Sequence, residues 1–249
     1  MIFERWIFLR DRRLPRRAIV VLAVLFVLFL IALFPLRLAL AWVGSGKHGI
    51  TAQAVHGSIW SGQIGQLNAG PLPLGTVDAG LNPLPLLVGR PEVWVRRPDG
   101  AAAPFSAIAS GNGANIALRH VNGTVPLGGL AGALPVDSLG FGEFAMKLRD
   151  GKCQSAQGTV TLKVAPVSAL LPGDIAMSGN ARCDDGDLFV PMQGPTGMEK
   201  LMLRVKGSGK WTADLVLTGL PVEVSGPLLD MGFSARPGGG IGVKAGGTL

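Results

Sequence analysis

LMLRVKGSGKWTADLVL, residues 201–217, is the stretch that decides the fold class of this chain. Apolar residues take every second position from Leu201 to Val205 and again from Trp211 to Leu217. A period of two residues is typical of a β-strand with one buried face, and the Gly-Ser-Gly between the two runs is typical of a turn. The stretch therefore predicts an antiparallel hairpin with one apolar face and one mixed face.

The rest of the chain beyond residue 43 has the same strand-like pattern. It contains only five Phe, three Trp and no Tyr. Short Val, Leu, Ile and Ala runs are separated by Gly, Pro, Asn and Asp, and no stretch has a convincing helical period. A small motif with a central glycine recurs, and glycine inside a strand often marks a bend or bulge. We therefore expect a mainly β fold: a curved, largely antiparallel sheet with an apolar concave face. Expected strands lie near residues 139–150, 157–165, 174–183 and 187–191, and the recurring glycines are Gly57, Gly123, Gly158, Gly179 and Gly207.

The N-terminal region has a different character. Residues 18–34 are seventeen consecutive apolar residues, and extended to residue 36 the run would span roughly 28 Å as a helix, close to the thickness of a bilayer core. The sequence thus predicts a single transmembrane helix over residues 18–43. Four arginines precede it and favour an N-terminus in the cytoplasm: Arg12, Arg13, Arg16 and Arg17.

This topology divides the chain into a basic cytoplasmic tail (residues 1–17), the helix, and a domain across the membrane (residues 44–249). Two other interpretations of the N-terminus remain open. Residues 39–41, Ala-Leu-Ala, resemble a signal-peptide cleavage site, although the apolar run is longer than is usual for such peptides. The paired arginines are also a feature of twin-arginine export signals, but the flanking residues do not match.

The distribution of charge argues against a nucleic-acid partner. The chain has a net charge of +7, but residues 1–17 alone hold six arginines against two acidic residues. Beyond Arg37 there are sixteen basic and fourteen acidic residues, so the domain that would have to dock on a duplex is almost neutral.

Two cysteines, Cys153 and Cys183, each end an expected strand. If the domain lies outside the cytoplasm, it is in an oxidising compartment where paired thiols become disulfides. We expect a Cys153–Cys183 disulfide, which would stabilise the fold by about 3–4 kcal/mol in the chain-entropy model. Independent thiols are the alternative.

No catalytic motif was found in the sequence. The three histidines are scattered, and H-E-x-x-H, G-x-S-x-G, S-x-x-K and the phosphate-binding G-x-x-x-x-G-K pattern are absent. The acidic residues 184–187, Asp-Asp-Gly-Asp, could attract a cation but are more typical of a hairpin turn. Trp60 could anchor a ligand but is more typical of a core residue. We expect no enzymatic activity, no cofactor and no metal.

Two segments carry a resemblance to a known family. Residues 57–62 read Gly57-Ser58-Ile59-Trp60-Ser61-Gly62, and the leucine-rich residues 82–90 end in Gly-Arg. Together with the membrane helix and the late cysteine pair, they make the chain resemble the type II secretion system protein N family. The family-like residues are Gly57, Ser58, Trp60 and Gly62.

The resemblance implies a non-enzymatic accessory subunit of the bacterial inner membrane, single-pass, with a periplasmic β domain and other type II secretion components as partners. The aromatic-poor, one-sided strands are also similar in texture to AsmA-like periplasmic proteins. That similarity motivates an alternative function, the binding or handling of lipid.

Overall fold

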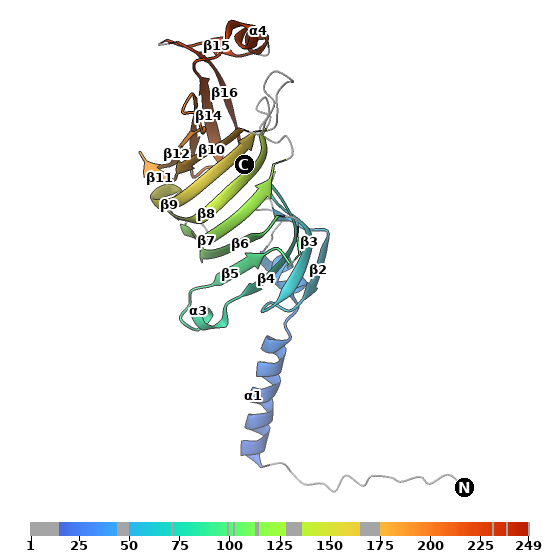
Figure 1. The fold of residues 1–249 in the computed structure, drawn as a ribbon. Helices are drawn as coiled ribbons and strands as arrows, with labels where there is room; N and C mark the ends of the chain where they lie inside the picture. Colours follow the sequence, from blue (N-terminus) through green and yellow to red (C-terminus); the bar gives the residue numbers. More distant parts are fainter. Residues whose placement is uncertain are drawn as a thin grey trace, which may run out of the picture.

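The computed structural model describes residues 15–43, 50–70, 72–98, 100–101, 103–112, 115–127, 136–164, 175–230, 232–237 and 239–248. Two helices at the N-terminus lead into one large β-sheet (Figure 1). The helices are α1 (Arg16–Ala32), α2 (Leu36–Val43), α3 (Pro83–Leu87) and α4 (Val222–Asp230). The strands are β1 (Ile50–Thr51), β2 (Ala54–Gly57), β3 (Gly62–Ala69), β4 (Leu72–Leu81), β5 (Glu92–Arg96), β6 (Phe105–Asn112), β7 (Asn115–Pro126), β8 (Val136–Arg149), β9 (Lys152–Val164), β10 (Ile175–Asn180), β11 (Arg182–Asp184), β12 (Asp187–Gln193), β13 (Glu199–Val205), β14 (Lys210–Leu217), β15 (Ser234–Ala235) and β16 (Ile241–Thr248).

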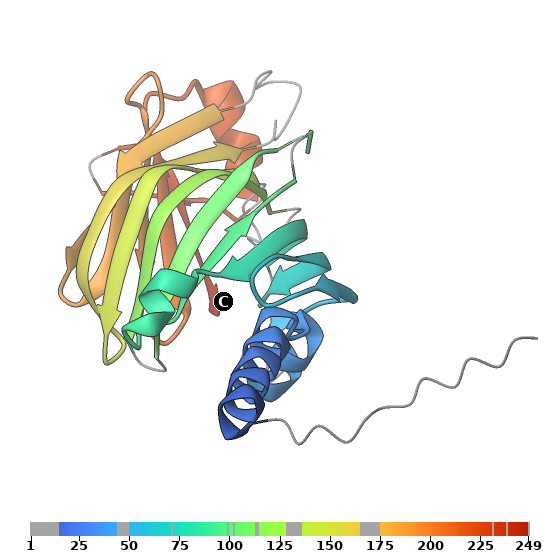
Figure 2. The same cartoon turned by 90° about the horizontal axis from the view of Figure 1, so that it is seen from below.

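All sixteen strands belong to one antiparallel sheet, so the expected fold class, mainly β and largely antiparallel, is confirmed. Neighbours along the sheet are mostly neighbours in sequence, as in a long meander: β3 to β10 follow one another in order, and β12, β13, β14 and β16 continue the series. The sheet is open, and Figure 2 shows it curling into the shape of a half-barrel.

The predicted hairpin is present as β13 and β14. Leu201 pairs with Leu215, Leu203 with Ala213, and the turn lies between residues 205 and 210. The alternation of apolar residues was sufficient to predict this hairpin because both strands and their turn lie within one continuous stretch of sequence.

One face of the sheet forms the core. Val160 and Leu162 are buried on β9 while Thr161 between them is only half-buried, and the same alternation is found on neighbouring strands. Val121 of β7 and Leu215 of β14 belong to the same buried cluster although five strands lie between them in the order of the sheet. A single-layer sheet brings such distant strands together by curling, so this is the inner face of the curve.

Bulges contribute to the curvature. The β7–β8 and β8–β9 registers both shift, and Glu143 adopts a positive φ of 47° at the second shift. Of the recurring glycines, Gly57, Gly123 and Gly158 have a positive φ. Gly179 and Gly207 do not, and their role is different: a Cβ on either would overlap the backbone of a neighbouring strand or turn. The pattern thus combines bends with close backbone approaches.

The N-terminal helices differ from the single transmembrane helix that the sequence predicts. The single helix expected over residues 18–43 is divided into α1 and α2 by the segment from Leu33 to Pro35. Proline lacks the N–H that would continue the helix, and its ring clashes with the preceding turn. Arg16 and Arg17 begin α1 and are exposed, whereas Arg12 and Arg13 lie outside the described residues. In the part of the chain that the structure describes, no helix combines the length and the hydropathy needed to cross a membrane.

The expectation that no helix follows the N-terminal segment is wrong in two places. Pro83 and Pro85 lie in the first turn of α3, where a missing N–H costs no hydrogen bond. The second helix, α4, contains Gly226 and follows Pro221, and both residues weaken its helical pattern in the sequence.

Candidate functional site

The family-like residues 57–62 form the turn between β2 and β3. Gly57 pairs with Gly62 across this turn and has a φ of 91°, a conformation that favours glycine. Ser58 forms an isolated β-bridge with Pro35, the residue that separates α1 from α2. The turn is therefore in direct contact with the N-terminal helices.

Three hydrogen bonds connect the turn to its surroundings. The Ile59 N–H donates to the carbonyl of Phe34 over 2.9 Å, and the Leu81 N–H at the end of β4 donates to the carbonyl of Ile59 over 2.8 Å. The Trp60 indole Nε1–H donates to the carbonyl of Ile31 over 3.1 Å. The last carbonyls of a helix have no partner within the helix; Trp60 supplies one of two donors to the Ile31 carbonyl, the other being the Phe34 N–H at 3.4 Å.

Glycines allow the close packing of this region, which we call the helix–sheet junction (residues 31–36, 57–62 and 80–81). A Cβ on Gly62 would lie 2.6 Å from Leu36 Cδ2 and 2.6 Å from the His56 carbonyl oxygen. A Cβ on Gly80 would overlap the carbonyl group of Trp60. The spacing of the motif thus follows from the need for helix and sheet backbones to approach each other.

Helix α2 completes the junction. Leu36 is buried and packs in a small apolar cluster with Ile64, Leu67, Val77 and Ala79 of β3 and β4. This cluster explains why the apolar segment divides at Pro35: the part beyond it covers the sheet, while α1 buries no side chain in the protein. Trp60 is half-buried, so it is neither the core residue that the sequence favoured nor an exposed ligand anchor.

The outer face of the sheet carries a groove of about 280 Å³ over β7, β8 and β9. Its floor contains Gly140 and Gly142, and its walls include Thr159, Thr161 and Lys163. Neither of these two glycines has a positive φ, and a Cβ on either would be in ordinary contact, at 3.5 Å and 3.8 Å from its nearest neighbour. The backbone therefore does not require glycine at these two positions, where the missing side chains leave space for the groove.

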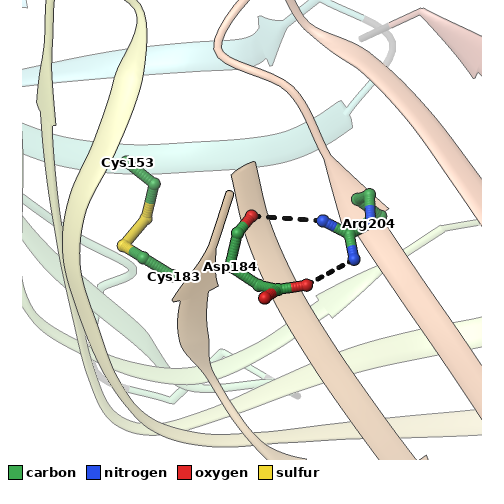
Figure 3. The surroundings of a disulfide bond; sticks show 4 residues. All are labelled: Cys153, Cys183, Asp184 and Arg204. Carbon is green, nitrogen blue, oxygen red and sulfur yellow. Dashed lines mark hydrogen bonds and ion pairs between the residues drawn. A yellow bond between two sulfur atoms is a disulfide. The ribbon is translucent and has the colours of Figure 1, made fainter. Parts of the chain in front are cut away.

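The expected disulfide between Cys153 and Cys183 is present and joins β9 to β11, with 5.5 Å between the Cα atoms (Figure 3). The Cys153 N–H also donates to the carbonyl of Gly186, over 2.7 Å. Gly186 lies in the turn between β11 and β12, where Asp184 pairs with Asp187, as the hairpin interpretation of this acidic segment predicts. The disulfide thus fixes the β11–β12 hairpin to the start of β9.

The acidic turn has a cationic partner. The Arg204 guanidinium contacts Asp184 twice, with Nη1 donating to the backbone carbonyl over 3.1 Å and Nη2 to the carboxylate over 2.5 Å (Figure 3). The hydrogen bond to the Asp184 side chain is the main reason that the pKa of Arg204 lies above its usual value. Arg204 also lies over the ring of Phe189. No group of residues that could hold a metal ion occurs among the described residues.

A second arginine was not anticipated from the sequence. Arg97, which follows β5, donates to the carbonyls of Leu74 over 3.0 Å and of Ala103 and Thr124 over 2.7 Å each. Partial burial lowers its pKa from the usual arginine value. Arg97 connects β4, the loop before β6, and β7, and no local signal in the sequence could have named three backbone carbonyls as its partners.

These features define a class of protein: a single-layer, curled antiparallel sheet joined at its N-terminal end to an apolar helix. The family model for type II secretion system protein N matches residues 48–229. The chain belongs to this family, which associates it with type II secretion and with other components of that system. Comparison with curated proteins and with solved structures found no match.

Proposed function

We propose that the protein is a non-enzymatic accessory subunit of the type II secretion system that is anchored in the inner membrane and binds other components through a periplasmic β domain. The observation that carries this proposal is the difference between the two faces of the sheet. The inner face is filled by the chain's own side chains, with Met177, Val190 and Met192 each 1% exposed, whereas the outer face carries a groove whose lining includes Thr159, Thr161 and Lys163. An outer face of this kind is suited to contact with another protein.

Membrane anchoring is supported by α1. None of its residues is buried, and the apolar side chains from Ile19 to Ile31 are mostly about half exposed, an arrangement that is unfavourable in water. Arg16 and Arg17 begin the helix, where the helix dipole disfavours cations. Their position is better explained by a cytoplasmic location of this end.

A periplasmic location is supported by the disulfide. Disulfides persist in oxidising compartments and are rare in the cytosol. Since α1 precedes the sheet and the arginines precede α1, a helix inserted with its arginines inside would place Cys153 and Cys183 outside.

The alternative, a lipid-handling module, has less support. A lipid trough needs apolar side chains that are accessible from the concave face, but the centre of that face is occupied by the buried cluster around Met177 and Met192. Native mass spectrometry of the full chain released from detergent would reveal a retained lipid if the alternative holds.

The experiment that tests the proposal is co-purification of the tagged full chain from crosslinked membranes. We expect to recover other type II secretion components from cells with an assembled apparatus. Gly140→Trp should reduce this recovery because it fills the groove, whereas Gly226→Trp adds the same side chain in open space on α4 and should not. Recovery of no secretion component with the unaltered chain would refute the proposal.

A further inference from the structure

Helix α3 exposes an unusual amount of apolar surface. Leu87, Leu84 and Val88 are 83%, 77% and 71% exposed, and they are the three most exposed large apolar side chains in the described part of the chain. Even on α1, no apolar side chain is more than 65% exposed. Three such side chains within five residues are a concentrated apolar patch that needs a partner.

The position of α3 indicates what that partner is. Phe34, just after α1, accepts a hydrogen bond from Ile59, and Ile59 accepts one from Leu81, two residues before α3 begins. The start of α3 is therefore linked through two backbone hydrogen bonds to the end of α1. Figures 1 and 2 both show α3 at the end of the sheet from which α1 projects, far from α4.

The local chemistry of α3 suits a lipid surface. Pro83 and Pro85 contribute no N–H groups, and the N–H groups of Val88, Gly89 and Arg90 donate to carbonyls within the same turn, so these five residues leave no unpaired N–H group to desolvate.

The nearby charges fit an anionic surface. Arg90 is exposed beside the patch, and the carboxylate nearest to it in the sequence, Glu92, is buried and paired with Arg119 at 2.7 Å. An apolar patch with an adjacent exposed cation is the pattern of a segment that lies in the interface of an anionic membrane.

We propose that α3 is a second membrane contact, with Leu84, Leu87 and Val88 immersed in the interface on the side where α1 ends and Arg90 at the level of the lipid phosphates. This inference rests on the proposed anchoring by α1. Two points of attachment would hold the sheet in a fixed orientation on the membrane, which one helix followed by a free linker would not.

The test uses the full chain reconstituted into vesicles of phosphatidylethanolamine and phosphatidylglycerol. Three variants, Leu25→Cys on α1, Leu87→Cys on α3 and Leu229→Cys on α4, each receive one NBD fluorophore. The two native cysteines are joined in the disulfide and would not be labelled. Leu229 is the matched control, because it is an exposed leucine on a short helix at the opposite end of the molecule.

We expect the labels at positions 25 and 87 to emit at shorter wavelength than the label at position 229, and to be quenched by lipids that carry a nitroxide. In a Val88→Cys variant that also carries Leu84→Ser and Leu87→Ser, quenching of the label should be lost. Quenching at position 25 without quenching at position 87 would overturn the inference but leave the anchor intact. Absence of quenching at both positions would overturn both. A shift of the position 87 label to shorter wavelength that occurs only in native membranes containing the secretion apparatus, and not in the vesicles, would also overturn the inference. It would indicate that α3 contacts a protein.

Discussion

The helix–sheet junction can be tested by adding a single methyl group. Gly80 lies in β4, where a Cβ would overlap the carbonyl group of Trp60, with 2.6 Å to the carbonyl carbon and 2.8 Å to Trp94 Cζ2. The first obstacle is backbone, which cannot rotate away, so either β4 or the turn at Trp60 has to move. Gly80→Ala should therefore cost about 1–3 kcal/mol, the usual range for overpacking a filled site.

Gly140→Ala is the matched control. Gly140 also lies in the interior of a strand and also lacks a positive φ, but its Cβ would be 3.5 Å from Thr161 Cβ, an ordinary contact. We expect this variant to be as stable as the unaltered protein or more stable by up to about 1 kcal/mol, because alanine restricts the unfolded chain.

The assay is urea unfolding of the full chain in detergent, monitored by tryptophan fluorescence. Gly80→Ala should lower the transition midpoint and leave the slope unchanged. Equal midpoints for Gly80→Ala and Gly140→Ala would refute the close packing of the junction, and so would a larger loss in Gly140→Ala.

Three further predictions concern single contacts. Replacing both Cys153 and Cys183 by Ala should lower the stability by roughly 4 kcal/mol, as expected for a sequence separation of 30; the reduced unaltered protein should behave alike in calorimetry, and no change would contradict the role of the disulfide. Arg97→Met should cost about 1.5–3 kcal/mol in the urea assay because three carbonyls lose a charged donor. Arg96→Met, which removes an exposed ion pair of 3.9 Å and an exposed contact with the Trp94 ring, should cost less than about 1 kcal/mol. Equal losses would show that the three hydrogen bonds of Arg97 do not stabilise the sheet. Trp60→Phe should cost about 0.5–1.5 kcal/mol because the Ile31 carbonyl loses one of its two donors, and should speed limited proteolysis between α1 and the sheet. Unchanged cleavage would show that the Trp60 hydrogen bond does not hold α1 to the sheet.

The sheet could be predicted from the sequence because its signals are local. The alternation in residues 201–217 specified both strands of a hairpin, and two of the five recurring glycines proved to mark positive φ at shifted registers. The extent of the curl could not be predicted, because it depends on how side chains as distant as Val121 and Leu215 share one cluster.

The junction was visible in the sequence only as a motif. Residues 57–62 suggested a family, but their partners are a helix carbonyl at Ile31 and a side chain at Leu36, which no local pattern identifies. The division of the apolar segment into two helices could not be predicted for the same reason. The apolar run continues across Pro35, and only the packing of Leu36 against Ile64 and Val77 shows that this residue belongs to the core of the sheet.

The central claim is that the outer face of the sheet binds another component of the secretion system. It is tested most directly by placing the photoreactive residue p-benzoylphenylalanine at Thr161, in the wall of the outer groove, and at Leu229 as a control. On irradiation of cells with an assembled apparatus, we expect adducts between position 161 and a type II secretion component, and none from position 229. Adducts with lipid alone at position 161, or no adduct in the presence of the assembled apparatus, would contradict the account.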